Sequence, residues 1–587
     1  MNILIEPIFI GLIQTIISIA LISGVIYTGS IINIFFFQKY NHIFLNLLIS
    51  IIFFSQLLKI FTYLGLFKEA HFILSFVLLF FGIYNIKNFL KFLEIKNLLL
   101  KLGKKEFLIT AFIFSLFIVS ISPPSMADAL DYHFGIPLYL LKFNILPSIN
   151  LWLYGNVGGN GDIINSTALY FGSDNFGSLI QFSSLLLFFL FLKKEINERN
   201  KFNFLIVFIL SSPTILQLIS GPKFMLLPQL MTTAALYFFI KLKKIRIIDF
   251  IFIVTLLMGA TQFKSSFIIS GSLIGLLIFF KAFVFDKIKI LLITLLLFSF
   301  FFIPTAIWNF FQISDFDLIN IFTLMPAEMM NNMKSFRENN IIYPFNLFIP
   351  DSLGSISTIL GFQFLLLFLS FKKTRKFNSI ILITLGTIVI HYFIGMNVSR
   401  MYYEYVLWLA ISFVFINDKR IDYKFYRKLI LPQLLLIFCF SLYFATISIP
   451  TIFSNKSRDV FMIKNSYNYA AMKWINKTLP PNARVISRLR SVSFLKNEFI
   501  SMDSLDFGLT NESLINYVEQ IKEKKMNYII LHTNQLKNHP FKNCLGPRFA
   551  QSDNFILATR NPMNNKFKYK ITIFHFNYDQ LPICFKN

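Results

Sequence analysis

Long apolar runs alternate with short polar linkers over the first 450 residues of the chain. A helix needs about 18 to 20 apolar residues to cross a bilayer, and about fourteen runs come near this length. The pattern predicts a polytopic α-helical membrane protein. The candidate spans lie near residues 8–36, 43–66, 71–88, 107–122, 176–192, 203–220, 224–240, 248–263, 266–281, 289–308, 353–371, 378–395, 401–416 and 429–450.

Lysine and arginine residues gather in every second linker between these runs. Because basic residues are retained on the cytoplasmic side, these linkers are predicted to be cytoplasmic. They are 87–105, 193–201, 241–246, 281–289, 372–376 and 418–428. The other linkers are then expected on the periplasmic or external side of a multi-pass plasma (inner) membrane protein. Two external segments, 123–175 and 309–352, are too long to be simple connectors.

The composition changes after Pro450, where the continuous apolar runs end. The stretch "SYNYAAMKWINKTLPPNARVIS" is typical of an amphipathic helix, a Pro-Pro turn and a strand, and "NESLINYVEQIKEKKMNYIILH" of a capped helix followed by a strand. These patterns predict a small external α/β domain. The chain is thus divided into additional N-terminal membrane helices (1–106), a membrane core (107–452) and a C-terminal domain (453–587).

Composition and charge support this interpretation. The 587 residues are 56% hydrophobic, with a mean hydropathy of +0.64, which excludes a soluble multi-domain protein. A net charge of +26 would suggest nucleic-acid binding in a soluble protein, but here the basic residues lie mostly in the linkers. No nucleic-acid partner is therefore expected. Cys544 and Cys584 both lie in the external domain, where an oxidising compartment would allow a disulfide between them.

The acidic stretch "DALDYH" follows the apolar run 107–122 on the predicted external side. It holds Asp128, Asp131 and His133 in a chain that is otherwise basic. Carboxylates just beyond the external end of a membrane span could belong to a solvated loop, or they could act as a general base or electrostatic anchor at the membrane surface. The residues alone leave both interpretations open.

The longer stretch "ADALDYHFGIPLYLLKFNILPS" resembles the first external loop of the GT-C superfamily of integral-membrane glycosyltransferases. These are the mannosyltransferase and aminoarabinose-transferase-like enzymes that use polyprenyl-phosphate sugars. Bacterial members often carry an Asp-x-Leu-x-Tyr-His-x-x-x-Pro pattern in this loop. The matching residues here are Asp128, Leu130, Tyr132, His133 and Pro137.

The resemblance implies a GT-C-like fold and a transferase that moves a sugar from a polyprenyl-phosphate donor to a lipid, glycan or protein acceptor, with inversion favoured. It assigns Asp128 as the base that accepts the proton of the attacking hydroxyl. Asp131 stands where the family often has a neutral polar residue. His133 would hydrogen-bond the base or the substrate, or pack the loop, and Tyr132 is expected to contact the substrate.

A second acid, Asp162 in "GGNGDIINSTALYFG", stands where family members often place a Pro-x-x-Glu-like element that points back at the first loop. The proline is absent here, and a flexible turn is the alternative interpretation. Asp128, Asp131 and Asp162 could share a divalent cation, and the sequence leaves this open.

Three isolated cations, Lys223, Lys264 and Arg400, lie at span ends on the predicted external side. A lipid phosphate would lie at this depth, where lysine and arginine can bind it. The alternative is that their side chains extend to lipid headgroups. The stretch "SRMYYEY", with Arg400 and Tyr403, is similar to the family's Arg-Tyr element near the donor phosphate, so Tyr403 is a candidate substrate-binding residue.

A transporter or flippase of lipid-linked glycans is an alternative, as is a glycan polymerase or ligase. Transporters usually show repeated halves and charges inside their spans, whereas this chain shows no internal repeat and few charges within its apolar runs. A polymerase or ligase would rely on arginine and histidine in a large late external loop. The segment 309–352 holds one arginine and no histidine.

Overall fold

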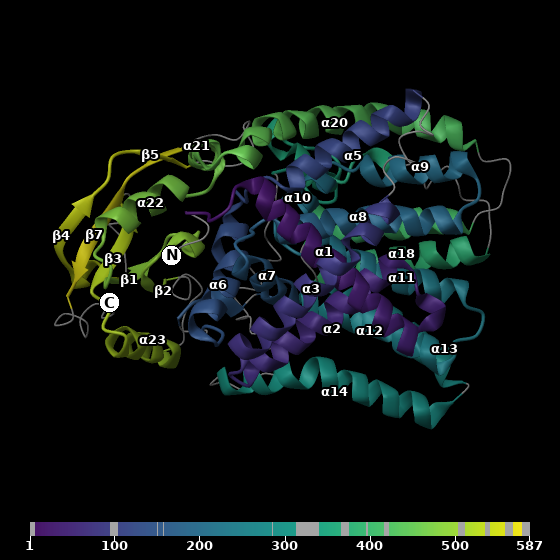
Figure 1. Cartoon of the computed structure of the whole chain (residues 1–587), viewed down its shortest axis with the longest axis horizontal. Coiled ribbons are helices and arrows are strands. Elements are labelled where there is room, and N and C mark those ends of the chain that lie inside the picture. Colours follow the sequence, from purple (N-terminus) through teal and green to yellow (C-terminus); the bar gives the residue numbers. More distant parts are fainter. Residues whose placement is uncertain are drawn as a thin grey trace.

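The first 450 residues form a helical bundle, and the C-terminal part forms a small sheet domain at one end of it (Figure 1). The predicted class, a polytopic helical membrane protein with a small C-terminal α/β domain, is confirmed. The computed structural model describes residues 6–93, 104–148, 151–156, 158–284, 286–312, 340–364, 375–394, 397–415, 422–502, 511–533, 541–557 and 567–577.

The bundle is helical because a backbone surrounded by lipid must satisfy its own hydrogen bonds. The helices of the bundle are α1 (Gly11–Phe36), α2 (Ile43–Tyr63), α3 (Phe67–Leu93), α5 (Lys104–Ser120), α6 (Phe134–Phe143), α7 (Asn160–Tyr170), α8 (Phe176–Glu195), α9 (Arg199–Leu210), α10 (Thr214–Ile219), α11 (Leu226–Lys241), α12 (Ile247–Phe263), α13 (Ile268–Phe283), α14 (Lys287–Gln312), α18 (Arg375–Ile394), α19 (Ser399–Val414) and α20 (Tyr423–Phe453).

Seven helices of the described chain are long and apolar enough to cross a membrane. The expected span 203–220 is instead divided into α9 and α10, because Pro213 has no N–H and disfavours helical backbone just before it. The expected span 353–371 begins with short 3-10 turns, and its residues 365–371 lie outside the described part, as does most of the loop 309–352. The total of about fourteen spans stays a prediction.

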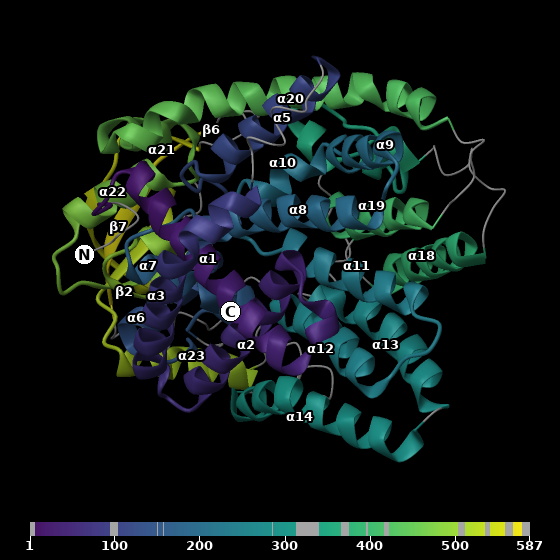
Figure 2. The same cartoon turned by 45° about the vertical axis from the view of Figure 1, so that its right-hand side comes forward.

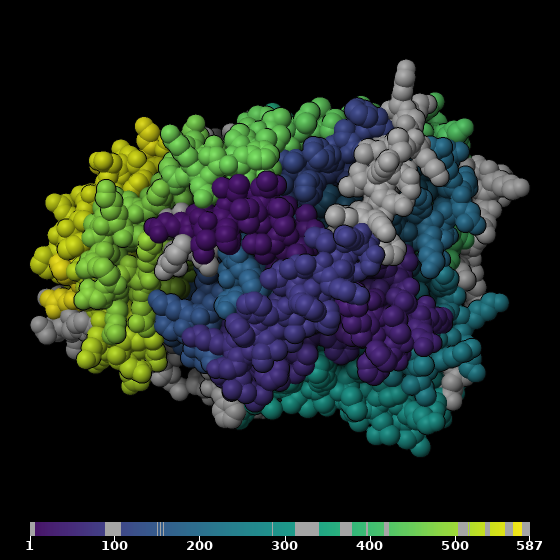
Figure 3. Space-filling view, in the orientation of Figure 1, coloured from purple at the N-terminus to yellow at the C-terminus, as the bar shows by residue number. Residues whose placement is uncertain are grey.

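Ion pairs mark the two ends of the bundle. Glu6, just before α1, lies 2.8 Å from Lys496 of the C-terminal domain. Lys39, just after α1, lies 2.9 Å from Asp249 in the first turn of α12. In the space-filling view the N-terminal residues, in purple, reach to the yellow-green C-terminal domain (Figure 3). The α1–α2 linker and the start of α12 therefore share one end, and the C-terminal domain covers the other.

Helices α14 and α20 flank the bundle on opposite sides, as both cartoon views show (Figure 2). Their outer faces expose large apolar side chains, including Leu291, Leu292 and Leu296 on α14 and Leu436 and Tyr443 on α20. Such continuous apolar faces are unfavourable in water and fit contact with lipid chains.

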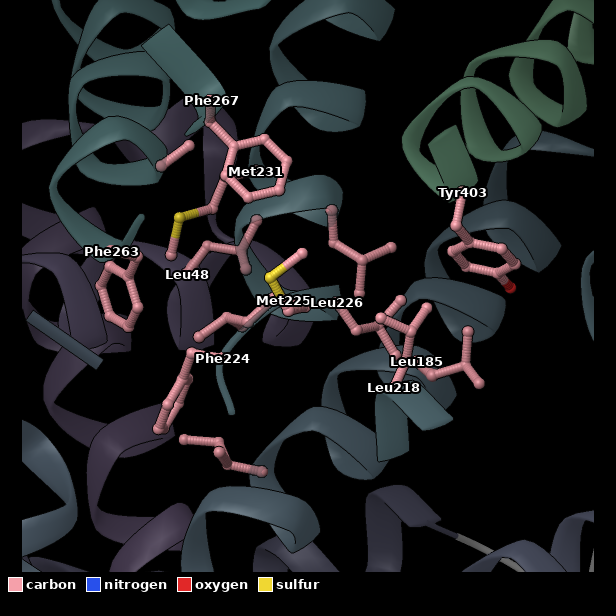
Figure 4. Packing of buried hydrophobic residues seen from close by; sticks show 14 of the residues in the cluster. Leu48, Leu185, Leu218, Phe224, Met225, Leu226, Met231, Phe263, Phe267 and Tyr403 are labelled. Atoms are coloured by element: carbon pink, nitrogen blue, oxygen red, sulfur yellow. The ribbon is translucent and has the colours of Figure 1, made fainter. Parts of the chain in front are cut away.

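The interior of the bundle is packed by side chains from several helices. Leu48 of α2, Met231 of α11 and Phe267 beside α13 gather around the start of α11, with Phe224 and Phe263 close by (Figure 4). All five are at most 3% exposed. This packing fixes the ends of α11 and α12, where two of the predicted site residues lie.

Helices α1 and α3 approach each other so closely that glycine is required at the contact. A Cβ atom at Gly82 would lie 1.9 Å from the carbonyl oxygen of Ala20, and one at Gly24 would lie 1.9 Å from that of Leu78. Small residues allow membrane helices this backbone contact.

We expect Gly82→Ala to lower the midpoint of thermal unfolding in detergent, because the added methyl group forces α1 and α3 apart and overpacking typically costs about 1–3 kcal/mol. Gly386→Ala in α18 is the matched control, since no described atom beyond its own helix backbone lies within 4 Å of its Cβ position. An equal midpoint in the two variants would contradict the close contact.

The C-terminal domain is built on a five-stranded sheet with the order β2-β1-β3-β7-β4. Strand β1 pairs in parallel with β2 and β3, whereas β7 pairs antiparallel with β3 and β4. Its elements are α21 (Asn455–Asn465), α22 (Tyr469–Thr478), β1 (Arg484–Ser487), β2 (Glu498–Ser501), α23 (Asn511–Glu523), β3 (Tyr528–His532), β4 (Leu545–Gln551), β5 (Phe555–Leu557), β6 (Phe567–Tyr569) and β7 (Ile571–Phe576).

Candidate active site

A wide π-helical turn, Ala129–His133, leads into α6 and carries most of the acidic stretch. Pro137 lies inside α6 and has no N–H to donate to the carbonyl of His133, so a regular α-helix is disfavoured here. Turns of this kind are frequent at functional sites. Asp131 and His133 lie in the turn, and Asp128 immediately precedes it.

Asp128 is held between two cations from distant parts of the chain. Lys223 Nζ donates to Oδ2 at 2.9 Å, and Arg490 Nη2 donates to Oδ1 at 2.9 Å. The Asp128 side chain keeps 31% of its surface exposed. Burial raises its pKa, but the charges of Lys223, Arg490 and Arg400 outweigh this effect and hold the pKa well below its usual range. Asp128 is therefore ionised at neutral pH.

Asp131 is buried and binds the same Arg490 guanidinium group as Asp128. Arg490 Nε donates to its Oδ2 at 2.9 Å, and the residue is only 1% exposed. Burial raises the pKa of Asp131, and the negative charge of Asp128 adds to this, while Arg490 opposes it. The two carboxylates thus differ in access: Asp128 keeps an exposed face and Asp131 does not.

His133 pairs with Asp162 in the first turn of α7. Their Nδ1 and Oδ1 atoms lie 2.5 Å apart, and Asp162 Oδ2 accepts the backbone N–H of Gly159 at 3.1 Å. Burial lowers the pKa of His133, although the Asp162 carboxylate opposes this. With a carboxylate oxygen as the acceptor, Nδ1 is the donor, and in the neutral imidazole Nε2 then carries the lone pair. Nε2 is buried and has no partner among the described residues.

Lys264 lies at the C-terminal end of α12, on the same side of the bundle as Lys223 and Arg400. Burial and the positive charges of these two residues lower the pKa of Lys264 to about 7. The carboxylates of Asp128 and Asp162 act on it in the opposite direction. The predicted cations therefore gather with the predicted acids in one electrostatic group.

A cavity of about 370 Å³ opens beside Asp128, and Lys223 and Arg400 line it together with this carboxylate. Its other walls come from α5, the region of α10, α20 and Tyr467 of the C-terminal part. The large apolar residues in the walls include Val119, Leu216, Leu218, Met225 and Phe444. The cavity therefore combines one acid and two cations with an apolar surface.

The two predicted tyrosines are placed differently. Tyr132 is buried in the π turn, with its ring stacked 6.1 Å from that of Tyr154. Tyr403 lies in the core of the bundle, where its hydroxyl donates to the carbonyl of Ile209 at 3.0 Å (Figure 4). It is not among the residues that line the cavity, and its role in substrate binding stays a prediction.

Family comparisons cover residues 5–587 of the chain. The DUF1420 N-terminal domain matches residues 5–462, and the DUF1420 C-terminal domain matches residues 463–587. The chain belongs to the DUF1420 family. No curated protein matches the sequence of this DUF1420 chain at a significant level.

Two crystal structures of ArnT from Cupriavidus metallidurans are similar to this DUF1420 chain. The structure bound to undecaprenyl phosphate has a TM-score of 0.47 and covers 79% of this chain and 96% of ArnT. The apo structure has a TM-score of 0.48 and covers 79% of this chain and 97% of ArnT. Sequence identity is 10% in both cases.

A metal site and a disulfide were further expectations. Within the described residues of the DUF1420 chain, no group of three or more His, Cys, Asp and Glu side chains could hold a metal ion. Asp128 and Asp162 bind different partners, and a divalent cation between them stays a prediction. Cys544 is buried in the C-terminal domain, whereas Cys584 lies outside the described residues, so their pairing also stays a prediction.

Arg490 is the residue of the site that the sequence does not indicate. It lies after β1 in the stretch "SRLRS", which also contains Arg488, and has no motif around it. Its distance in sequence from Asp128, 362 positions, hides the contact. Only the docking of the C-terminal domain onto the π turn identifies it.

Proposed function

We propose that this DUF1420 protein is a membrane glycosyltransferase that moves a sugar from a polyprenyl-phosphate-linked donor to a lipid, glycan or protein acceptor at the external face of the plasma membrane. The observation that carries the proposal is the cavity in which Asp128, Lys223 and Arg400 meet above apolar walls. The motif around Asp128 supports the same reaction class.

The cavity suits a donor with a charged head and an apolar chain. Lys223 and Arg400 provide positive charge for a phosphate, which must accept the electron pair of the broken sugar–phosphate bond. The apolar residues from α5, α10 and α20 offer a surface for the isoprenoid chain.

Asp128 is the candidate base because it has an exposed face in this cavity. Its carboxylate would accept the proton of an acceptor hydroxyl as that oxygen bonds to the anomeric carbon and the polyprenyl phosphate leaves. Direct attack from the opposite face inverts the anomeric centre. With Lys223 and Arg490 bound, Asp128 is a weak base. A donor phosphate that took over Lys223 would make the carboxylate more basic.

The test is turnover by protein purified in detergent. An undecaprenyl-phosphate-linked sugar with a radiolabel is mixed with the protein and a membrane extract that supplies acceptors. We expect label to move from the donor to another molecule, with release of undecaprenyl phosphate. Movement of intact donor across proteoliposomes without cleavage of the sugar–phosphate bond would instead identify a transporter and overturn the proposal.

In the same assay, we expect Lys223→Gln and Arg400→Gln each to raise the KM for the donor. A lost hydrogen bond to a charged group is worth about 1.5–3 kcal/mol, which corresponds to roughly 10- to 150-fold. Lys496→Gln is the control, because Lys496 lies on the same side of the protein but pairs with Glu6. A KM equal to that of the control in both variants would show that neither Lys223 nor Arg400 binds the donor.

A further inference from the structure

We infer that Arg490 is a positioning residue of the active site, supplied by the C-terminal domain, which holds the catalytic carboxylate in place. The inference rests on the proposed function and deepens it. It assigns separate tasks to the two oxygens of Asp128: Oδ1 is fixed by Arg490, while Oδ2 contacts Lys223 at the cavity and accepts the proton when the donor engages that lysine.

The loop that carries Arg490 is held in one conformation. Ser491 has a φ of 75°, a left-handed conformation that serine rarely adopts. Its hydroxyl donates to the carbonyl of Tyr467 at 3.0 Å, and Asn468 Nδ2 donates to the carbonyl of Arg490 at 3.4 Å. Backbone that deviates in this way and is held by side chains is typical of functional positions.

The C-terminal domain is docked onto the membrane part by hydrogen bonds to backbone carbonyls of the acidic stretch. The Ser493 hydroxyl, in the loop that carries Arg490, donates to the carbonyl of Leu130 inside the π turn. The Tyr467 N–H donates to the Ser125 carbonyl at 3.3 Å, just before Asp128. The C-terminal domain therefore contacts the acidic stretch on both sides of the carboxylate that Arg490 binds.

The side chain of Arg490 uses the geometry that distinguishes arginine from lysine. Its Nε binds Asp131 and its Nη2 binds Asp128, both at 2.9 Å, so that one planar group bridges two carboxylates. The guanidinium also lies over the ring of Tyr154, with its carbon 4.9 Å from the ring centroid. A lysine ammonium would keep the charge but lose the planar fork that spans both acids.

Removal of Arg490 would change the charge balance of the carboxylate pair. Two acids three positions apart would lose their shared counter-charge, and the buried Asp131 would favour its neutral form. The pKa of Asp128 rises when a cation is removed, so Asp128 becomes protonated sooner as the pH falls. Activity that needs ionised Asp128 would then begin to fall at a higher pH than in the wild type. The other titratable groups that face the pair or Arg490 are Lys223, Lys264, Arg400, Tyr132, Tyr154 and Tyr467.

The test compares Arg490→Gln and Arg490→Lys with Arg484→Gln in the turnover assay. Arg484 is the matched control, because it lies on β1 of the same domain and its side chain contacts Glu498 and Lys524 there. For Arg490→Gln we expect kcat to fall about 100-fold, as for a displaced catalytic group, with the KM for the donor changed less than about threefold. The acid limb of the kcat/KM profile should move up by about one to two pH units.

Arg490→Lys should restore the position of the acid limb, since it keeps the charge, but only part of kcat. Retention of undecaprenyl phosphate binding, measured as stabilisation against heat, shows that Arg490→Gln is folded with its donor cations in place. Full activity with an unchanged pH profile in Arg490→Gln would overturn the inference while the proposed function stands. A loss of kcat with an unshifted acid limb would also overturn it. A wild-type protein that transfers no sugar in the assay would instead contradict the proposed function, and the inference that rests on it.

Discussion

An Asp128→Asn variant is expected to lose sugar transfer, with kcat about 10²- to 10⁴-fold below that of the wild type. The amide has nearly the same shape as the carboxylate but cannot accept the proton of the acceptor hydroxyl. Asp128→Ala should lose at least as much. The measurement is transfer of label from an undecaprenyl-phosphate-linked sugar by protein purified in detergent.

The control for this prediction is Asp553→Asn, which removes an exposed acid of the C-terminal domain. The variant at Asp128 should still bind undecaprenyl phosphate, since Lys223 and Arg400 remain, and the loss of a negative charge near the phosphate would favour binding. Near-normal transfer by both Asp128→Asn and Asp128→Ala would show that another group accepts the proton. Asp131 and His133 would then be examined first.

The second large effect concerns stability. Arg458 of α21 and Asp174 in the turn before α8 form an ion pair, and their side chains are only 4% and 3% exposed. Arg458→Ala would leave the Asp174 charge buried without a partner, which typically lowers the free energy of unfolding by about 3–5 kcal/mol. We expect a clear fall in the midpoint of thermal unfolding, measured in detergent.

Two further variants separate the buried charge from the loss of a contact. Replacing both partners, Arg458→Met with Asp174→Leu, should recover much of the stability because no charge remains buried. Lys473→Ala breaks a pair with Asp459 whose side chains are 39% and 34% exposed, and should cost at most about 1 kcal/mol. Equal losses for Lys473→Ala and Arg458→Ala would contradict the importance of burial.

Apolar runs predicted most helices of the bundle because length and hydropathy alone decide whether a segment is stable in lipid. The pattern was less informative where backbone chemistry decides at which residue a helix begins or ends. Pro213 divides the expected span 203–220 into α9 and α10. The expected external loop 123–175 contains the two ordered helices α6 and α7, whose short apolar faces pack against the bundle.

The candidate site was predictable in part. Asp128, Lys223 and Arg400 share one cavity because alternate linkers of a membrane bundle meet at the same end. Which acid each cation would bind was not predictable, since this depends on side-chain distances across separate helices. Arg490 could not be selected from the basic residues of the C-terminal domain, and Tyr403 lies in the core although its neighbour Arg400 reaches the cavity.

The contact between Arg490 and Asp128 also fixes when, during synthesis of the chain, the site can form. The two residues are 362 positions apart, which corresponds to roughly 20 to 70 s of synthesis at about 5–20 residues per second. During that interval the acidic stretch and its membrane helices already exist, but the arginine has not been made. The site can therefore become complete only after the last domain has been made and docked. A nascent or C-terminally truncated chain holds Lys223 and Arg400 without the arginine that fixes the carboxylate.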